Sequence, residues 1–144
     1  MRPALLDVNV LIALLDPEHA FHEPAHDWFR RERKHGWATC PITENAVLRI
    51  LSKPSYPYTG VTTGDVRELL AEFCQIKGHV FWADSISMRD ATMLNLTGIG
   101  PKGITDVYLL ALAVANGGCL VTFDAGIRQE SVVGCLEGSL CRLR

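Results

Sequence analysis

Short apolar runs alternate with longer segments of helical periodicity along this chain. Each run has four or five residues, which suits a strand buried in a parallel sheet, and the segments between them repeat apolar residues at helical spacing. The predicted strands are 3–6, 37–40, 79–83 and 119–123, with 140–143 as a candidate fifth. The predicted helices are 8–15, 19–34, 43–53, 62–77, 85–96 and 105–115. Because strands and helices alternate, we expect right-handed crossovers and an α/β fold with a parallel sheet.

The size and composition of the chain are those of one globular domain. It has 144 residues, of which 48% are hydrophobic and 21% charged, so we expect a single domain over residues 1–144. The formal net charge is −2, which gives no positive field of the kind that attracts nucleic acids. A site that neutralises phosphates with metal ions does not need such a field, so a polyanionic substrate stays open.

The cysteines and the N-terminal residues predict a cytoplasmic protein. Five cysteines are spread along the chain without a C-x-x-C pair, which is typical of free thiols in a reducing compartment. The N-terminus looks at first like a signal peptide, but Asp7 and Asn9 interrupt its apolar stretch and no small-residue cleavage site follows. No apolar run reaches the length of about 18 residues that a membrane span needs.

Four acidic residues directly follow apolar runs, where surface acids are uncommon. Asp7 follows PALL, Glu44 follows CPIT, Asp106 follows GIT and Asp124 follows CLVTF. Sites in open parallel sheets form beyond the carboxyl ends of the strands, and all four acids are predicted at that edge. Crowded carboxylates raise one another's pKa, a cost that a divalent cation removes. Oxygen ligands without paired His or Cys favour Mg²⁺, with Mn²⁺ as a substitute.

Four segments resemble, in order and spacing, the acidic motifs of PIN domains, in particular those of the VapC-like ribonuclease toxins of prokaryotic type II toxin–antitoxin modules. The segments are LLDVNVLIALL, TENAVLRIL, ITDVYLLALA and LVTFDAGI, and the resemblance covers nearly the whole chain. It implies a three-layer αβα sandwich with a short central parallel sheet, and metal-dependent endonucleolytic cleavage of RNA. It also implies that Asp7, Glu44, Asp106 and Asp124 are the catalytic, metal-binding acids. Family members differ in how directly the fourth acid contacts the metal.

Smaller polar residues beside the acids are expected to support them. The resemblance assigns Asn9 to orienting the first carboxylate or a metal-bound water, although Val8 replaces the family's usual small hydroxyl residue. Thr105 and Thr122 lie where a hydroxyl would steady the acids. Arg49, on the same predicted helix as the second acid, is the candidate phosphate contact, with a surface salt bridge as the alternative.

Three histidines, His19, His22 and His26, have a spacing that imitates a zinc site on one helix face. No fourth ligand is evident, and Pro24 disturbs the helical geometry. We therefore interpret them as part of a partly buried helix face.

Three other functions compete with that of a toxin. A phosphatase of the haloacid-dehalogenase type also begins with a strand ending in Asp, but it needs a second acid two residues later, where this chain has Asn9. A PIN-like module without catalysis is the second alternative, and the presence of all four acids argues against it. The third is a housekeeping RNA-processing nuclease, which sequence does not separate from a toxin, although a minimal domain favours the toxin.

The toxin interpretation also predicts a substrate and binding partners. The resemblance implies RNA as the substrate, a small antitoxin protein as the cognate partner, and a toxin homodimer. Which RNA is cleaved stays open, because substrate choice depends on loop shape and groove electrostatics.

Overall fold

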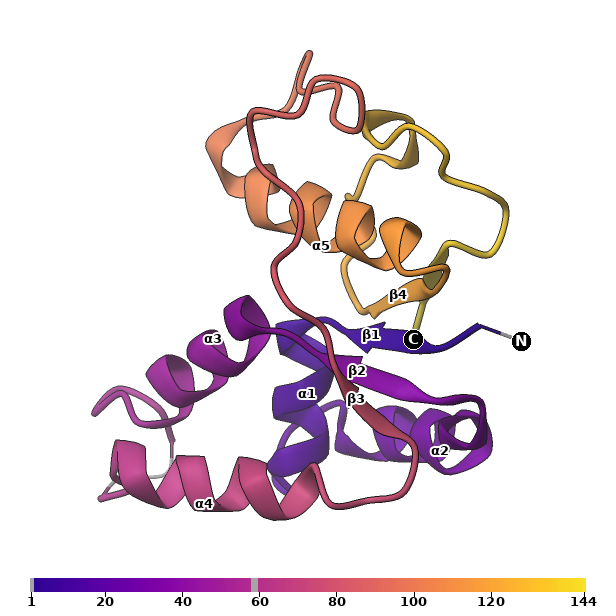
Figure 1. The fold of residues 1–144 in the computed structure, drawn as a ribbon. Coiled ribbons are helices and arrows are strands. Elements are labelled where there is room, and N and C mark those ends of the chain that lie inside the picture. Colours follow the sequence, from indigo (N-terminus) through magenta and orange to yellow (C-terminus); the bar gives the residue numbers. More distant parts are fainter. Residues whose placement is uncertain (1, 58–59) are drawn as a thin grey trace.

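A parallel sheet of five short strands forms the centre of the molecule (Figure 1). The computed structural model describes residues 2–57 and 60–144. The strands are β1 (Ala4–Leu6), β2 (Trp37–Thr39), β3 (His79–Phe81), β4 (Cys119–Thr122) and β5 (Leu140–Arg142). Their order is β3-β2-β1-β4-β5, and every neighbouring pair is parallel, which confirms the predicted sheet.

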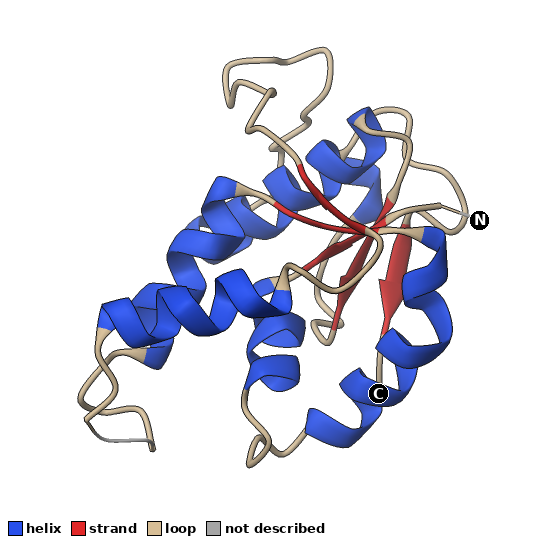
Figure 2. Ribbon diagram, turned by 60° about the horizontal axis from the view of Figure 1, so that its bottom comes forward, coloured by secondary structure: helices blue, strands red, loops and turns tan. Residues whose placement is uncertain are grey.

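Helices cover both faces of this sheet. They are α1 (Val8–Leu15), α2 (His22–Glu32), α3 (Pro41–Leu51), α4 (Thr63–Phe73) and α5 (Ile104–Ala115). In Figure 1, α1 to α4 lie below the sheet and α5 lies above it, and Figure 2 shows the strands between the helices. The three layers confirm the αβα sandwich. No helix among the described residues has the length and apolar character needed to cross a membrane.

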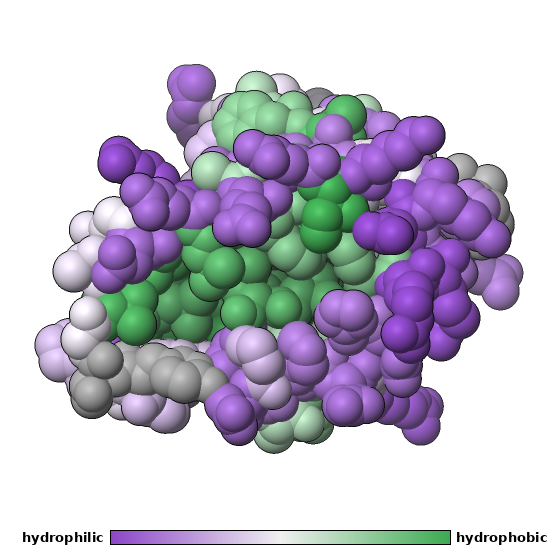
Figure 3. Space-filling model, turned by 90° about the horizontal axis from the view of Figure 1, so that it is seen from below, coloured by the Kyte–Doolittle hydropathy of each residue, from purple (hydrophilic) through white to green (hydrophobic). Residues whose placement is uncertain are grey.

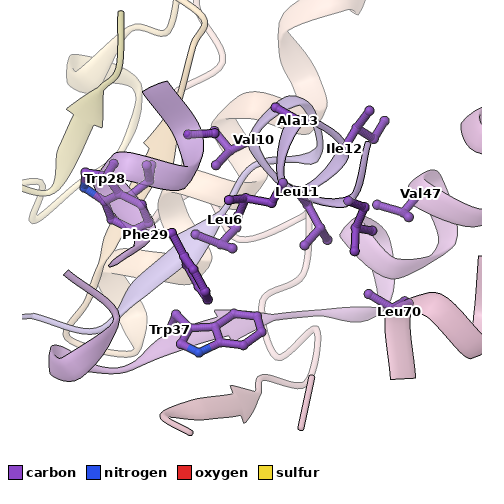
Figure 4. Packing of buried hydrophobic residues seen from close by; sticks show 14 of the residues in the cluster. Leu6, Val10, Leu11, Ile12, Ala13, Trp28, Phe29, Trp37, Val47 and Leu70 are labelled. Atoms are coloured by element: carbon purple, nitrogen blue, oxygen red, sulfur yellow. The ribbon is translucent and has the colours of Figure 1, made fainter. Parts of the chain in front are cut away.

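Each face of the sheet has its own apolar core. Below the sheet, Leu6 and Trp37 from the strands pack with Leu11 of α1 and Phe29 of α2 (Figure 4). The rings of Phe29 and Trp37 meet edge-on with centroids 5.1 Å apart, a geometry that aromatic pairs prefer. Above the sheet, α5 buries the continuous run 107–113. The strands are therefore held from both sides, which fixes the position of their carboxyl ends.

Local chemistry at the helix starts explains two shifted boundaries. The helix α3 begins at Pro41 and not at residue 43, because proline suits the first helical position, which needs no N–H. The helix α2 begins at His22 and not at residue 19, so Pro24 falls in its first turn, where the missing N–H costs nothing. The side chain of Asp7 caps α1 by accepting a hydrogen bond from its first backbone N–H.

The helix predicted over residues 85–96 does not form, so this prediction is wrong. Asp90 Oδ1 accepts hydrogen bonds from the backbone N–H groups of Thr92 at 2.9 Å and Met93 at 3.3 Å. Such bonds from a side chain to nearby backbone compete with helix formation. Leu94 is buried and forms an isolated antiparallel bridge with Val132. The apolar residues of this segment therefore join the upper core from a loop.

The strand order changes direction at β1, in the centre of the sheet. From β1 the chain proceeds to β2 and β3 on one side, whereas β4 lies on the other side of β1 and leads outward to β5. In open parallel sheets, such a switch leaves a crevice beyond the carboxyl ends of the two central strands, and ligands bind there. The ends of β1 and β4 are therefore the place where a functional site is expected.

Candidate metal centre

Two acids meet at the carboxyl ends of β1 and β4. Asp7 follows β1 and is buried, and its Oδ1 accepts a hydrogen bond of 2.7 Å from the backbone N–H of Val8. Its Oδ2 accepts a hydrogen bond of 2.6 Å from the hydroxyl of Thr122, the last residue of β4. The same hydroxyl accepts a hydrogen bond of 3.0 Å from the backbone N–H of Asp124. Thr122 thus links the first and fourth acids across the switch point.

Asp106, in the first turn of α5, is the third acid at this place. Burial, a hydrogen bond with Asp124 and the charges of Asp7 and Asp124 raise the pKa of Asp106 to about 7. Burial also raises the pKa of Asp7, against the lowering effect of its two hydrogen bonds. Near neutral pH Asp106 is therefore still partly protonated, whereas an isolated surface acid would be ionised.

These three carboxylates suit a hard divalent cation. Among the described residues, the one ion pair joins Arg30 to Asp27 on the exposed surface of α2, so the three acids have no Lys or Arg partner. Repelling carboxylates without a countercharge are the environment that Mg²⁺ stabilises. The ligand atoms of Asp7, Asp106 and Asp124 do not all lie within 4.8 Å of one another. An ion bound here would therefore not contact all three carboxylates at once without movement of the side chains, and water would complete its shell, as is usual for Mg²⁺.

Glu44, the other predicted ligand, contacts Thr39 of β2, which in turn contacts His79 of β3. It lies in the first turn of α3, and its Oε2 accepts a hydrogen bond of 2.6 Å from Thr39 Oγ1. The same hydroxyl lies 2.8 Å from His79 Nε2. Burial, followed by the charge of Glu44, raises the pKa of the Cys74 thiol to about 11. The structure thus brings three of the predicted acids together and gives Glu44 polar neighbours that sequence reasoning missed.

The predicted supporting residues take separate places. Asn9 Oδ1 accepts a hydrogen bond of 3.4 Å from the backbone N–H of Phe123, so its amide ties α1 to the end of β4. Thr105 and Arg49 are both exposed and line one hollow of about 330 Å³, together with Asp84. Roles for Thr105 at the acids and for Arg49 at a phosphate stay predictions.

An arginine that sequence reasoning did not single out lies beside the acids. Arg128 and Asp106 line the same hollow of about 200 Å³, whose wall is rich in glycine. A Cβ atom on Gly98 would lie 3.0 Å from Arg128 Nη1, so the guanidinium passes close to bare backbone. An exposed arginine in a loop has no periodicity that marks it. The glycine-rich segment 98–103 was the only signal for this hollow.

The three histidines near the start of α2 do not share one helix face, because α2 begins only at His22. His19 lies before the helix, and His22 Nδ1 contacts a backbone carbonyl oxygen of α1 at 2.7 Å. In the described part of the chain, a single group of three His, Cys, Asp or Glu side chains has its ligand atoms within 4.8 Å of one another. None of His19, His22 and His26 belongs to that group.

Known proteins are similar to this chain in sequence or in fold. The sequence model of the PIN domain matches residues 4–131. Ribonuclease VapC44 of Mycobacterium tuberculosis is 42% identical over 141 residues, which cover 97% of this chain and 99% of the relative. Ribonuclease VapC39 of the same organism is 40% identical over 141 residues, with 93% and 97% covered. The structure of VapBC2 from Rickettsia felis bound to a DNA fragment from their promoter superposes with a TM-score of 0.59 at 13% identity, covering 98% of each chain, which shows a common fold. The chain belongs to the PIN domain family.

Proposed function

We propose that this protein is an Mg²⁺-dependent endoribonuclease, with Mn²⁺ as a substitute, and the toxin of a type II toxin–antitoxin module. The observation that carries the proposal is the group of Asp7, Asp106 and Asp124 at the switch point of the sheet, where the pKa of Asp106 is raised to about 7. Relatives named VapC ribonucleases, at 40% and 42% identity, support the same activity.

The chemistry follows from the needs of phosphodiester hydrolysis. That reaction requires an activated water, in-line geometry and relief of charge on the phosphate. The three aspartates, with Glu44 as the predicted further ligand, would hold Mg²⁺, which would supply charge neutralisation and Lewis acidity. Thr122 and the Val8 N–H hold both oxygens of Asp7 in place before any substrate arrives. Preorganised groups of this kind need little rearrangement during the reaction.

Two hollows lined by arginines suit the RNA backbone. Arg128 lines one of them together with Asp106, and Arg49 lines the other. Both arginines are exposed, and a guanidinium binds phosphate oxygens through paired N–H donors. Because the net charge is only −2, local cations and not a global field would bring the phosphates to the acids. We assign Arg49 and Arg128 to phosphate contact within this proposal.

The proposed partner is an antitoxin protein that covers an apolar face. Seen from below, apolar surface gathers in a hollow between polar rims (Figure 3). A cavity of about 90 Å³ on the side of α1 to α4 is lined by Leu15, Leu51, Val66 and Leu69, among others. An amphipathic helix or an extended segment buries its apolar side chains in grooves of this kind. The fold shared with VapBC2 supports such a pair, and we propose that the toxin acts as a homodimer in the cytoplasm.

Cleavage of RNA by the purified protein tests the activity. The wild type is expected to cut single-stranded RNA when Mg²⁺ is present and to stop when EDTA is added. Asp7→Asn is expected to lower the rate by at least about 100-fold, since even residues that only orient metal ligands contribute 10–100-fold. Glu68→Gln, exposed on α4, is the matched control and should cut at the wild-type rate. Cleavage by Asp7→Asn at the wild-type rate, or cleavage that persists in EDTA, contradicts the proposed reaction.

Expression in a bacterial host tests the role as a toxin. The wild type should arrest growth, Asp7→Asn should not, and co-expression of the adjacent upstream reading frame should restore growth. If RNA cleavage is intact but the neighbouring protein does not relieve the arrest, a housekeeping nuclease is the better interpretation. If purified protein binds RNA without cutting it, the chain is a non-catalytic binding module.

A further inference from the structure

A second group of metal-ligating side chains lies below the β2–β3 side of the sheet. Glu44 comes from the first turn of α3, Cys74 from the end of α4 and His79 from the first residue of β3. Each of the three offers a ligand atom, and these atoms all lie within 4.8 Å of one another. All three residues are partly buried, so water reaches them only in part. Three elements of secondary structure thus converge on one small volume.

We propose that Glu44, Cys74 and His79 form a binding site for a soft or borderline divalent cation of the Zn²⁺ class. A thiolate, an imidazole and a carboxylate are ligands that select Zn²⁺ or Co²⁺ over Mg²⁺, which prefers oxygen alone. Bonds of about 2.0–2.3 Å in tetrahedral geometry place ligand atoms about 3.3–3.8 Å apart. The three side chains therefore need to close by only about 1 Å around an ion. With three ligands from the protein, the fourth position falls to water.

A hydrogen-bonded residue already orients this group. Thr39 Oγ1 donates to Glu44 Oε2 at 2.6 Å, and a carboxylate held by one oxygen has the other free for an ion. The same hydroxyl contacts His79 Nε2 at 2.8 Å, so an ion either takes Nδ1 or replaces this contact. Partners that fix the orientation of metal ligands in this way are a regular part of metal sites. The Cys74 thiol would bind as the thiolate, and its proton would pass to solvent.

The charge balance of the group also favours a cation. Within the described part of the chain, the one ion pair lies on α2, so Glu44 is partly buried without a Lys or Arg partner. Charges taken out of water are stable only when they are paired or bound to a metal. A divalent ion satisfies Glu44 and compensates the thiolate at the same time.

Occupancy of this site has a consequence for catalysis that rests on the proposed function. Glu44 is also a predicted ligand of the Mg²⁺ site. An ion of the Zn²⁺ class would hold its carboxylate beside Cys74 and His79. We therefore expect such ions to slow RNA cleavage, which makes the group a regulatory site.

Titration of the purified full-length protein with Co²⁺ in excess Mg²⁺ tests the site without any assay of activity. The excess Mg²⁺ occupies the aspartates, which also carry no sulfur, so a thiolate-to-cobalt absorption band in the near ultraviolet reports on a cysteine ligand alone. The wild type is expected to bind one equivalent of Co²⁺ with this band, and Zn²⁺ should displace it. Cys74→Ser should lose the band, and His79→Gln should bind Co²⁺ at least about tenfold more weakly.

A matched control separates this site from the other thiols. Cys135→Ser removes a partly buried thiol whose contacts are Gln129 and Leu136, and it should keep the full band. Circular dichroism on each variant confirms that it is folded. If the wild type gives no band with one equivalent of Co²⁺, or if Cys74→Ser keeps it, the proposal is overturned and the group is only a hydrogen-bonded network around Thr39. Because this readout does not use RNA, it stays decisive even if the protein proves to have no nuclease activity.

Discussion

Replacing Asp106 with asparagine should stabilise the cation-free protein at pH 8 although it removes a predicted catalytic acid. The pKa of this carboxyl is raised from 3.8 to about 7, so ionising it in the folded state is unfavourable. At 1.36 kcal/mol per pH unit, this shift corresponds to about 4 kcal/mol. The side chain is only partly buried, and screening by water reduces the expected gain to about 2 kcal/mol. For a domain of this size, that gain corresponds to a rise in Tm of roughly 6 °C.

The gain has a defined dependence on pH. The unfolded chain ionises Asp106 near pH 3.8 and the folded chain near pH 7. Below the lower value both states carry the proton, and the cost of burying a charged carboxylate beside the other acids is absent. As pH rises through the window between the two values, the folded state loses stability, and the full loss is present above it. Asparagine does not titrate, so the difference in Tm between variant and wild type should be largest at pH 8 and less than about a third of that at pH 4.

Thermal unfolding in EDTA, followed by circular dichroism, measures this difference. Mg²⁺ should then stabilise the wild type more than Asp106→Asn, because a ligand that binds only the folded state stabilises it in proportion to its affinity. Glu68→Gln removes a similar charge from an exposed helix position and should stay within about 0.5 kcal/mol of the wild type. A Tm for Asp106→Asn at or below that of the wild type at pH 8 in EDTA refutes the argument that ionised Asp106, partly buried and beside Asp7 and Asp124, destabilises the folded protein.

Two further substitutions test contacts between β1 and β4, one at the carboxyl ends of these strands and one at their amino ends. Thr122→Val leaves Asp7 Oδ2 without its hydroxyl donor and should lower the free energy of unfolding in urea by about 1.5–3 kcal/mol. Thr122→Ser keeps a hydroxyl and should recover most of the loss. Equal stability of the valine variant and the wild type would show that this hydrogen bond contributes nothing. Gly118→Ala would place a Cβ 2.4 Å from the backbone oxygen of Pro3 and should cost about 2 kcal/mol or more. Gly117→Ala meets nothing within 4 Å and should cost only about 1 kcal/mol through its positive φ, so equal losses at the two glycines in the same assay would contradict the predicted clash.

The sequence predicts the elements whose burial leaves a simple pattern. Strand β4 is a continuous apolar run because the sheet is covered on both faces, and α5 is apolar nearly all round because it lies in the upper core. The segment 85–96 has apolar residues at spacings that also fit a helix, but Asp90 and Asn95 bond the backbone two residues on. Periodicity reports which residues are buried. It does not report whether a side chain offers the backbone a competing hydrogen bond.

The acids of the metal centre follow the same logic. Asp7, Asp106 and Asp124 were predictable as a group because the carboxyl ends of parallel strands meet at one edge. The surroundings of Glu44 were not, because they depend on the register between two strands. Pairing of β2 with β3 sets Trp37 opposite His79, which brings the imidazole within reach of Thr39. Neither Thr39 nor His79 belongs to a sequence motif, and the contact between them arises only once the sheet has formed.

Glu44 is a proposed ligand of both candidate metal sites, and this makes their separation testable. The aspartates at the switch point offer hard oxygen ligands, whereas the group below β2 and β3 adds a thiolate and an imidazole, so ligand softness alone should sort Mg²⁺ from Zn²⁺ between them. Glu44→Gln should therefore slow the Mg²⁺-dependent cleavage of RNA and also weaken the binding of Co²⁺. Cys74→Ser should affect only the binding of Co²⁺. If Glu44→Gln alters cleavage but leaves the thiolate-to-cobalt band intact, Glu44 serves the aspartates alone. If it removes the band and leaves cleavage unchanged, the carboxylate belongs to the softer site, as its contacts with Thr39 in the structure favour.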